Sequence, residues 1–136
     1  MRKNKLLDTF AVLAWLQDEP SASAVERILQ DAKRDGAELL MTLVNLGELY
    51  YILRRSLSAV ETRALLDMIL DLPVRAIPAT EDLVWEAAEI KACNPLSYAD
   101  CFAVAAARRE GAAVVTGDPE FKRVESIVEI EWLTPR

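Results

Sequence analysis

The sequence contains no histidine, and this absence excludes several kinds of active site. Without an imidazole group, the chain cannot form a Ser-His-Asp triad, an imidazole acid–base pair or a zinc site of the HExxH type. A metal ion bound by this protein must therefore be held by oxygen atoms.

Cysteine is also scarce, and long apolar runs are missing. Cys93 and Cys101 lack CxxC spacing, which favours thiols buried as small hydrophobic groups in a reducing compartment over a disulfide or redox pair. No apolar run approaches the roughly 20 residues that a membrane span needs. Asp8 interrupts the apolar stretch near the N-terminus, unlike in a signal peptide. We therefore expect a cytoplasmic protein without a membrane segment.

Positive charge is in the minority, since the formal net charge is −6. This balance argues against broad, nonspecific binding to nucleic acid, because basic patches supply most of that binding. Three short basic stretches remain candidates for contact with a phosphate backbone, although each is more typical of a solvated helix end. They are Arg54–Ser56, Arg108–Arg109 and Lys122–Arg123.

The sequence does have a regular alternation of short apolar runs and amphipathic segments. With 136 residues and 52% hydrophobic composition, it can bury one core, and we expect a single domain over residues 1–136. The patterns predict strands at 4–8, 37–43, 74–77, 112–117 and 126–133, and helices at 9–17, 23–36, 44–55, 63–72, 80–92 and 96–111.

Boundary residues support these predicted helices. Ser23 with Glu26, and Ser58 with Glu61, have the spacing of a capping box. Pro73 separates a predicted helix from a predicted strand. Further N-cap and C-cap signals are Thr9, Gly36, Thr80, Ser97 and Gly111. Because no linker or repeat interrupts the order, we predict one α/β domain with a mainly parallel sheet.

Four acids belong to the ligand-binding edge of such a sheet, which lies beyond the carboxyl ends of the strands. Asp8 ends the first predicted strand, and Asp118 follows the fourth in the segment AVVTGDPEF. Glu48 lies early in the helix that follows the second strand, and Asp100 lies in the first turn of the helix before the fourth. Each alone has an ordinary explanation as a helix cap, a turn former, a dipole partner or a solvated side chain.

Gathering these acids at one edge creates repulsion that a purely structural arrangement would avoid. We therefore expect at least one of them to have a raised pKa in the folded protein, and we expect a cation to relieve the repulsion. Oxygen ligands in an open site favour the hard ions Mg²⁺ or Mn²⁺. Because such ions bridge carboxylates to phosphate oxygens and water, the expected substrate is a phosphate compound.

Similarity to a known family rests on three segments: LLDTFAVLAWL, NLGELYYIL and LSYADCFAVAAARREGAAVVTGDPEF. They resemble the PIN-domain ribonucleases, and within them the VapC-type toxins of toxin–antitoxin pairs, in acidic motifs, spacing and apolar pattern over nearly the whole chain. The four catalytic acids of the family correspond to Asp8, Glu48, Asp100 and Asp118. Asn45 and Thr116 match polar positions that support those acids.

The resemblance implies a PIN-like three-layer α/β/α sandwich and metal-dependent hydrolysis of RNA phosphodiester bonds. Asp8, Asp100 and Asp118 would hold Mg²⁺ or Mn²⁺, and Glu48 would bind or orient a water molecule or a second ion. Phe10 departs from the family, which commonly has a small hydroxyl residue there. A cognate antitoxin and a homodimer are the expected protein partners, and apolar groups such as Trp15, Tyr50 and Tyr51 are candidates for their contacts.

Several other functions stay open. A PIN-type nuclease that is not a toxin shares every motif above. A Mg²⁺-dependent phosphatase with an aspartate nucleophile would need a second acid in a DxD-type strand end, which LLDTFA lacks. A receiver-like signalling domain would need paired acids near the start and a lysine after a late strand, where this chain has TGDPEF.

Overall fold

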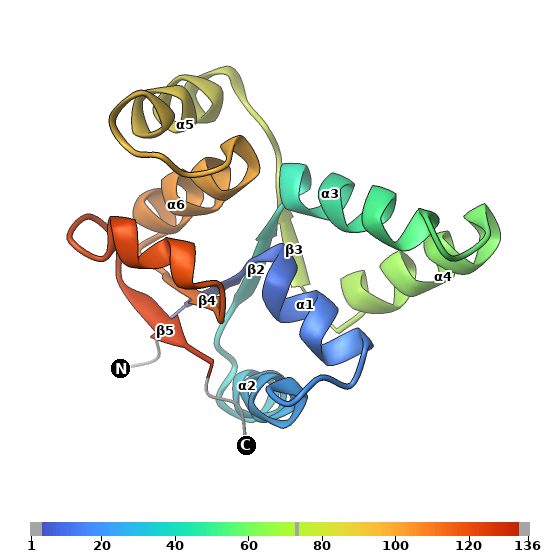
Figure 1. The fold of residues 1–136 in the computed structure, drawn as a ribbon. Helices are drawn as coiled ribbons and strands as arrows, with labels where there is room; N and C mark the ends of the chain where they lie inside the picture. The colour runs from blue at the N-terminus through green and yellow to red at the C-terminus, as the bar shows by residue number, and fades with distance from the viewer. Residues whose placement is uncertain (1–3, 73, 134–136) are drawn as a thin grey trace.

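A parallel sheet forms the centre of the protein in this computed structural model, which describes residues 4–72 and 74–133 (Figure 1). The strands are β1 (Lys5–Leu7), β2 (Leu39–Thr42), β3 (Val74–Ile77), β4 (Ala113–Thr116) and β5 (Ile130–Trp132). Their order is β3-β2-β1-β4-β5, and every pair of neighbouring strands is parallel. The predicted α/β class with a parallel sheet is confirmed.

Helices cover both faces of this sheet (Figure 1). They are α1 (Thr9–Leu16), α2 (Ala22–Asp35), α3 (Leu43–Arg54), α4 (Ala59–Leu70), α5 (Glu81–Cys93), α6 (Tyr98–Glu110) and the 3-10 helix η1 (Pro119–Val124). Among the described residues, none of these helices has the length and apolar character required to cross a bilayer.

The alternation of side chains along the strands creates two cores. Leu6 and Val114 pack in one core with α5, α6 and η1, whereas their neighbours Leu7 and Val115 pack in the other with α1 to α4. Because both faces are buried, the strands read as continuous apolar runs in the sequence. The result is the expected three layers, with the sheet in the middle.

Most of the predicted helix boundaries are confirmed. Ser58 and Glu61 form a capping box at the start of α4, and the Ser97 side chain caps α6. Gly36 and Gly111 adopt left-handed backbone conformations, with φ of 70° and 62°, at the ends of α2 and α6. A residue with a Cβ atom is strained there, which is why glycine ends these helices. Pro73 lies outside the described residues.

The capping box predicted at Ser23 and Glu26 is wrong. Helix α2 begins earlier, with Ser21 at its N-cap and no side-chain cap bond, so Ser23 lies inside the first turn. The carboxylate of Glu26 instead accepts a hydrogen bond of 2.7 Å from the indole N–H of Trp15. Glu26 therefore contacts α1 and does not cap its own helix in the way that the pattern predicts.

Two further predictions need correction. The strand predicted at 126–133 is only Ile130–Trp132, because η1 and the turns after it take up the preceding residues.

Both cysteines are free thiols, but only Cys101 is buried, and Cys93 is exposed at the end of α5. Cys93 ends a helix whose buried face is formed by Leu83, Ala87 and Ile90, so its own side chain points away from the core.

Candidate metal centre

Asp8 lies almost fully buried between the ends of β1 and β4, with an exposed fraction of 1%. Its Oδ1 accepts a hydrogen bond of 2.8 Å from the backbone N–H of Ala11, so Asp8 is the N-cap of α1. Its Oδ2 accepts a hydrogen bond from the hydroxyl of Thr116. The ordinary explanation of Asp8 as a helix cap is therefore correct, and it coexists with a position at the acidic edge.

Thr116 joins two of the predicted site residues. Its hydroxyl donates to Asp8 and also accepts a hydrogen bond of 3.0 Å from the backbone N–H of Asp118. Because Thr116 is completely buried at the end of β4, this hydroxyl fixes the Asp118 turn relative to β1. A supporting role for Thr116 is consistent with both contacts.

Glu48 is oriented by Thr9, which the sequence did not single out for this role. The hydroxyl of Thr9 donates a hydrogen bond of 2.6 Å to Oε1 of Glu48. Asn45 acts one step further away, since its Nδ2 donates to the Thr9 hydroxyl at 3.3 Å and to the carbonyl of Ala99 at 3.4 Å. Asn45 thus connects α1, α3 and the start of α6, next to Asp100.

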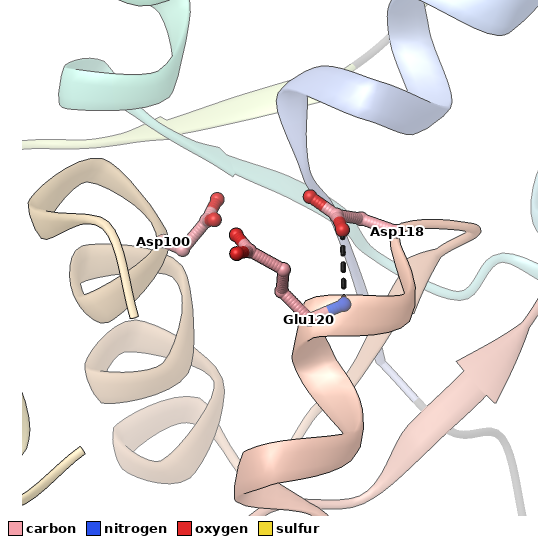
Figure 2. Close-up of side chains that lie close together, drawn as sticks. All are labelled: Asp100, Asp118 and Glu120. Carbon is pink, nitrogen blue, oxygen red and sulfur yellow. Dashed lines mark hydrogen bonds between the residues drawn. The ribbon is translucent and has the colours of Figure 1, made fainter. Parts of the chain in front are cut away.

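Three carboxylates approach one another beyond the sheet. Oxygen atoms of Asp100, Asp118 and Glu120 all lie within 4.8 Å of one another. Figure 2 shows the Glu120 side chain reaching from η1 to a position between Asp100 on α6 and Asp118 on the turn. The backbone N–H of Glu120 donates a hydrogen bond of 3.0 Å to Asp118 Oδ1.

Glu120 was missed by the sequence analysis. The available signal was its position two residues after Asp118, where the turn of a 3-10 helix brings its backbone onto the Asp118 carboxylate. The three-carboxylate group does not include Asp8 or Glu48. Assignment of Asp8 as a metal ligand therefore stays a prediction.

A groove of about 290 Å³ nevertheless brings all of these acids together. One part of its lining is acidic, and another part is apolar, contributed by α1 and α3. The lining residues are Asp8, Thr9, Phe10, Leu13, Glu48, Ile52, Ser97, Asp100, Asp118 and Glu120.

The pKa values of two acids rise in this environment. Burial raises the pKa of Asp8 to about 8, against the opposing effect of the Thr116 and Ala11 hydrogen bonds, and the charges of Asp100 and Asp118 add to the rise. Burial also raises the pKa of Asp100 to about 6, with further contributions from Glu48, Asp118 and Glu120. The expected direction is confirmed, but desolvation is a larger cause than the predicted repulsion.

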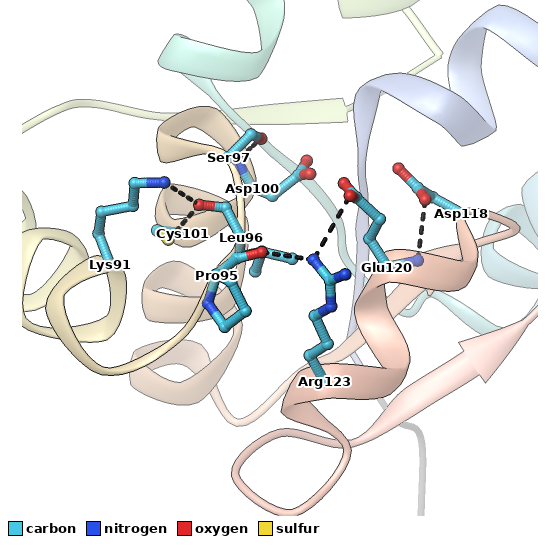
Figure 3. Close-up of polar contacts among 9 residues, drawn as sticks. All are labelled: Lys91, Pro95, Leu96, Ser97, Asp100, Cys101, Asp118, Glu120 and Arg123. Atoms are coloured by element: carbon cyan, nitrogen blue, oxygen red, sulfur yellow. Dashed lines mark hydrogen bonds and ion pairs between the residues drawn. The ribbon is translucent and has the colours of Figure 1, made fainter.

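Basic side chains hold the loop before α6 in place (Figure 3). Arg123 donates a hydrogen bond of 2.6 Å to the carbonyl of Pro95 and lies 3.5 Å from Oε1 of Glu120. From the other side, Lys91 donates a hydrogen bond of 2.6 Å to the carbonyl of Leu96. These contacts fix the segment that carries Ser97, the cap of the helix on which Asp100 lies.

The other predicted basic stretches lie away from the groove lining. Arg54 donates to the carbonyl of Leu57, and Arg109 forms an ion pair with Glu86. These contacts agree with the interpretation of both residues as parts of solvated helix ends.

The donor set fits a divalent metal ion. Carboxylate oxygens from three different positions converge. A positive charge placed there would favour the ionised forms of Asp8 and Asp100, whose pKa values are raised without it. Hard divalent cations prefer such oxygen ligands. The acidic cluster can therefore hold a divalent cation.

Comparisons with known proteins agree with the fold. The family model described as "PIN domain" matches residues 5–127, and the chain belongs to this family. No curated protein matches the chain in sequence.

Solved structures with the same fold have low sequence identity to this chain. VapBC2 from Rickettsia felis, bound to a DNA fragment from its promoter, superposes with a TM-score of 0.76 at 19% identity, covering 96% of this chain and 99% of that one. VapC20 from Mycobacterium tuberculosis, a Sarcin-Ricin loop cleaving toxin, gives 0.71 at 21% identity, covering 93% and 98%. A toxin–antitoxin complex from Klebsiella pneumoniae gives 0.70 at 14% identity, covering 97% and 99%.

Proposed function

We propose that this protein is a metal-dependent ribonuclease that hydrolyses RNA phosphodiester bonds, and that it is the toxin of a toxin–antitoxin pair. The observation that carries the proposal is the convergence of Asp100, Asp118 and Glu120 beside buried Asp8 in a PIN domain. Structural relatives that include an RNA-cleaving toxin and a toxin–antitoxin complex support the assignment.

The ion that fits this site best is Mg²⁺ or Mn²⁺, because both are small, hard and compatible with carboxylate and phosphate ligands. When bound, the ion polarises the scissile phosphate and lowers the pKa of a coordinated water molecule. Asp100 and Asp118 are proposed as ligands because the sequence predicted them and their carboxylates lie in the observed cluster, and Glu120 is the third member of that cluster. We retain Asp8 as a further proposed ligand, held in position by Thr116 and Ala11.

Glu48 is assigned to the attacking water. Thr9 holds its Oε1 by a hydrogen bond of 2.6 Å, which fixes the direction of the carboxylate. We assign to Oε2 the role of accepting a hydrogen bond from water and receiving its proton. Asn45 positions Thr9, so it acts on the reaction only through these neighbours.

The partners follow from the same assignment. RNA is the substrate, and the inhibitor is an antitoxin protein in the same cytoplasm. An arginine of the antitoxin reaching the acidic groove would neutralise the acids by charge-assisted hydrogen bonds. A homodimer is supported by Leu43 and Tyr98, which are 53% and 45% exposed at the starts of α3 and α6, two helices joined by the hydrogen bond between Asn45 and Ala99.

RNA cleavage with defined metals tests the nuclease assignment. Purified protein is incubated with total bacterial RNA in EDTA, Mg²⁺ or Mn²⁺, and new 5′ ends are mapped by sequencing. We expect discrete cuts with either ion and none in EDTA. Undiminished cleavage in EDTA would contradict the metal-dependent mechanism.

Growth of a host cell tests the toxin assignment separately. Expression of the chain alone should arrest growth, and co-expression of the small protein encoded next to it should restore growth. A harmless chain that binds no such partner would leave a PIN-type nuclease without a toxin role.

A further inference from the structure

Phe10 combines exposure with a position at the acidic groove. It lies on α1 two residues after Asp8, its exposed fraction is 37%, and it lines the groove together with Leu13 and Ile52. The groove therefore has an apolar wall facing the same space as the carboxylates. A purely structural phenylalanine would gain more by burying its whole ring.

The backbone of Gly117 holds the Phe10 ring in place. A Cβ atom added at Gly117 would lie 2.5 Å from Cε1 and 3.1 Å from Cζ of Phe10, so the ring packs directly against the turn that carries Asp118. This contact restricts the positions that the ring can take. The ring is therefore held beside the Asp118 turn before any ligand binds.

We propose that Phe10, with Leu13 and Ile52, forms the platform on which the base of a nucleotide adjacent to the scissile phosphate stacks. The proposal rests on the proposed ribonuclease function and adds a residue that sets which nucleotide is accepted. It follows from the groove itself, since a phosphate at the acidic cluster places its own nucleotides within reach of the apolar wall.

Stacking also addresses an electrostatic difficulty. The protein carries a net charge of −6, and acids dominate the groove, so the RNA backbone gains little from the protein's own charge. An aromatic ring offers affinity that does not depend on positive charge, because every base has a π-face. Loss of one such contact typically weakens binding by about tenfold.

The first experiment uses a synthetic RNA of about 20 nucleotides spanning a cut site mapped in total RNA. Steady-state cleavage in Mn²⁺ is measured over a range of RNA concentrations for the wild type, Phe10→Leu and Phe10→Tyr. Phe10→Leu keeps apolar bulk but removes the ring, and we expect kcat/KM to fall about tenfold, mainly through KM. Phe10→Tyr should recover most of the loss. Trp85→Leu, which removes a 65% exposed aromatic on α5 outside the groove, should leave cleavage unchanged.

The second experiment removes single bases from the RNA. An abasic nucleotide on the stacking side of the cut should lower wild-type kcat/KM about tenfold but should not lower that of Phe10→Leu further, because both changes remove one contact. Thermal melting of each variant verifies that the fold and its response to Mn²⁺ are retained.

The outcomes are distinct. If Phe10→Leu cleaves RNA like the wild type, the stacking role is wrong and Phe10 only packs on Gly117. The same conclusion follows if every abasic substitution lowers kcat/KM as much in Phe10→Leu as in the wild type. A variant that cleaves normally but escapes inhibition by the antitoxin would assign the apolar wall to the protein partner instead. If the wild type cuts no RNA with any metal, the ribonuclease proposal itself fails, and the stacking role fails with it.

Discussion

Acidic residues are paired with a basic side chain at one edge of the sheet and are clustered with one another at the other edge. At the amino edge, Arg75 pairs with Glu38 at 3.0 Å and with Glu110 at 2.8 Å. At the carboxyl edge, Asp100, Asp118 and Glu120 approach within 4.8 Å of one another. Arg123 lies 3.5 Å from Glu120 and gives its shorter bond to the backbone carbonyl of Pro95.

This difference separates acids that are paired within the chain from acids that we propose bind a cation. Carboxylates at the amino edge are neutralised within the chain, so they need nothing from outside. At the carboxyl edge, burial and the charges of Glu48, Asp118 and Glu120 raise the pKa of Asp100, and an external cation would supply the compensating charge. Variants matched across the two edges can therefore test the assignment, because the same chemical change should matter at only one of them.

The largest effect is expected from Asp100→Asn. It removes one charge from the cation site, so cleavage should fall on the order of 100-fold or more, given that a bound metal supplies several kcal/mol of stabilisation in the transition state. Glu110→Gln removes an acid of the amino edge and should leave cleavage unchanged. Rates are compared on the same RNA in Mg²⁺ and Mn²⁺. Equal losses in the two variants would show that the acids act through stability.

A smaller loss is expected from Thr116→Val, which keeps the shape of a buried side chain but removes the hydroxyl between Asp8 and Asp118. Residues that orient metal ligands typically change activity by about 10- to 100-fold. Thr62→Val is the matched control, since Thr62 is equally buried but donates to the carbonyl of Ser58 in α4. Both variants should lose some stability, and only Thr116→Val should lose activity.

Metal binding should also appear as stabilisation. At an ion concentration of ten times Kd, the free energy of unfolding should rise by about 1.4 kcal/mol in the wild type, because the ion binds the folded form. Asp100→Asn should be at least as stable as the wild type in EDTA and should show a smaller melting shift with Mg²⁺. Glu38→Gln should keep the full shift. A less stable Asp100→Asn with an unchanged Mg²⁺ response would make Asp100 structural.

The smallest effect is a difference in pH dependence without metal. Raised folded pKa values of about 8 for Asp8 and about 6 for Asp100, against the ordinary value of 3.8, favour the protonated fold. The contribution of these two acids to stability is therefore fully present below about pH 4 and is lost as the pH rises through each folded pKa. Asp100→Asn should reduce the slope of this loss below pH 6 by less than about 1 kcal/mol per pH unit. Because the Asp100 charge also raises the pKa of Asp8, the variant should complete the remaining loss at a lower pH than the wild type. Urea unfolding in EDTA measures both slopes.

Local patterns were sufficient to predict most of the fold. Gly36, Gly111, Ser58 and Ser97 mark helix ends in the sequence and in the structure, because the left-handed turn and the side-chain cap depend on neighbouring residues. Strand order placed the four predicted acids beside one groove for a similar reason, since every parallel strand ends at the same edge.

Contacts between distant segments could not be predicted in this way. Glu26 has the spacing of a cap, but its partner Trp15 lies on another helix. Thr9 orients Glu48 across 39 positions of sequence, and no local pattern records that pairing. The place of Glu120 between Asp100 and Asp118 depends on the path of η1, which the sequence patterns did not predict.

The hydrogen bond between Asp8 and Thr116 joins positions 108 residues apart. A chain that is still being synthesised has made Asp8 long before it has made β4, so β1 lacks one of its two neighbouring strands while most of the protein emerges. Contacts of such long range form late, because the intervening chain must first be ordered. The groove therefore cannot be assembled on a nascent chain that lacks residue 118, and we expect an incomplete translation product to lack the proposed RNA cleavage.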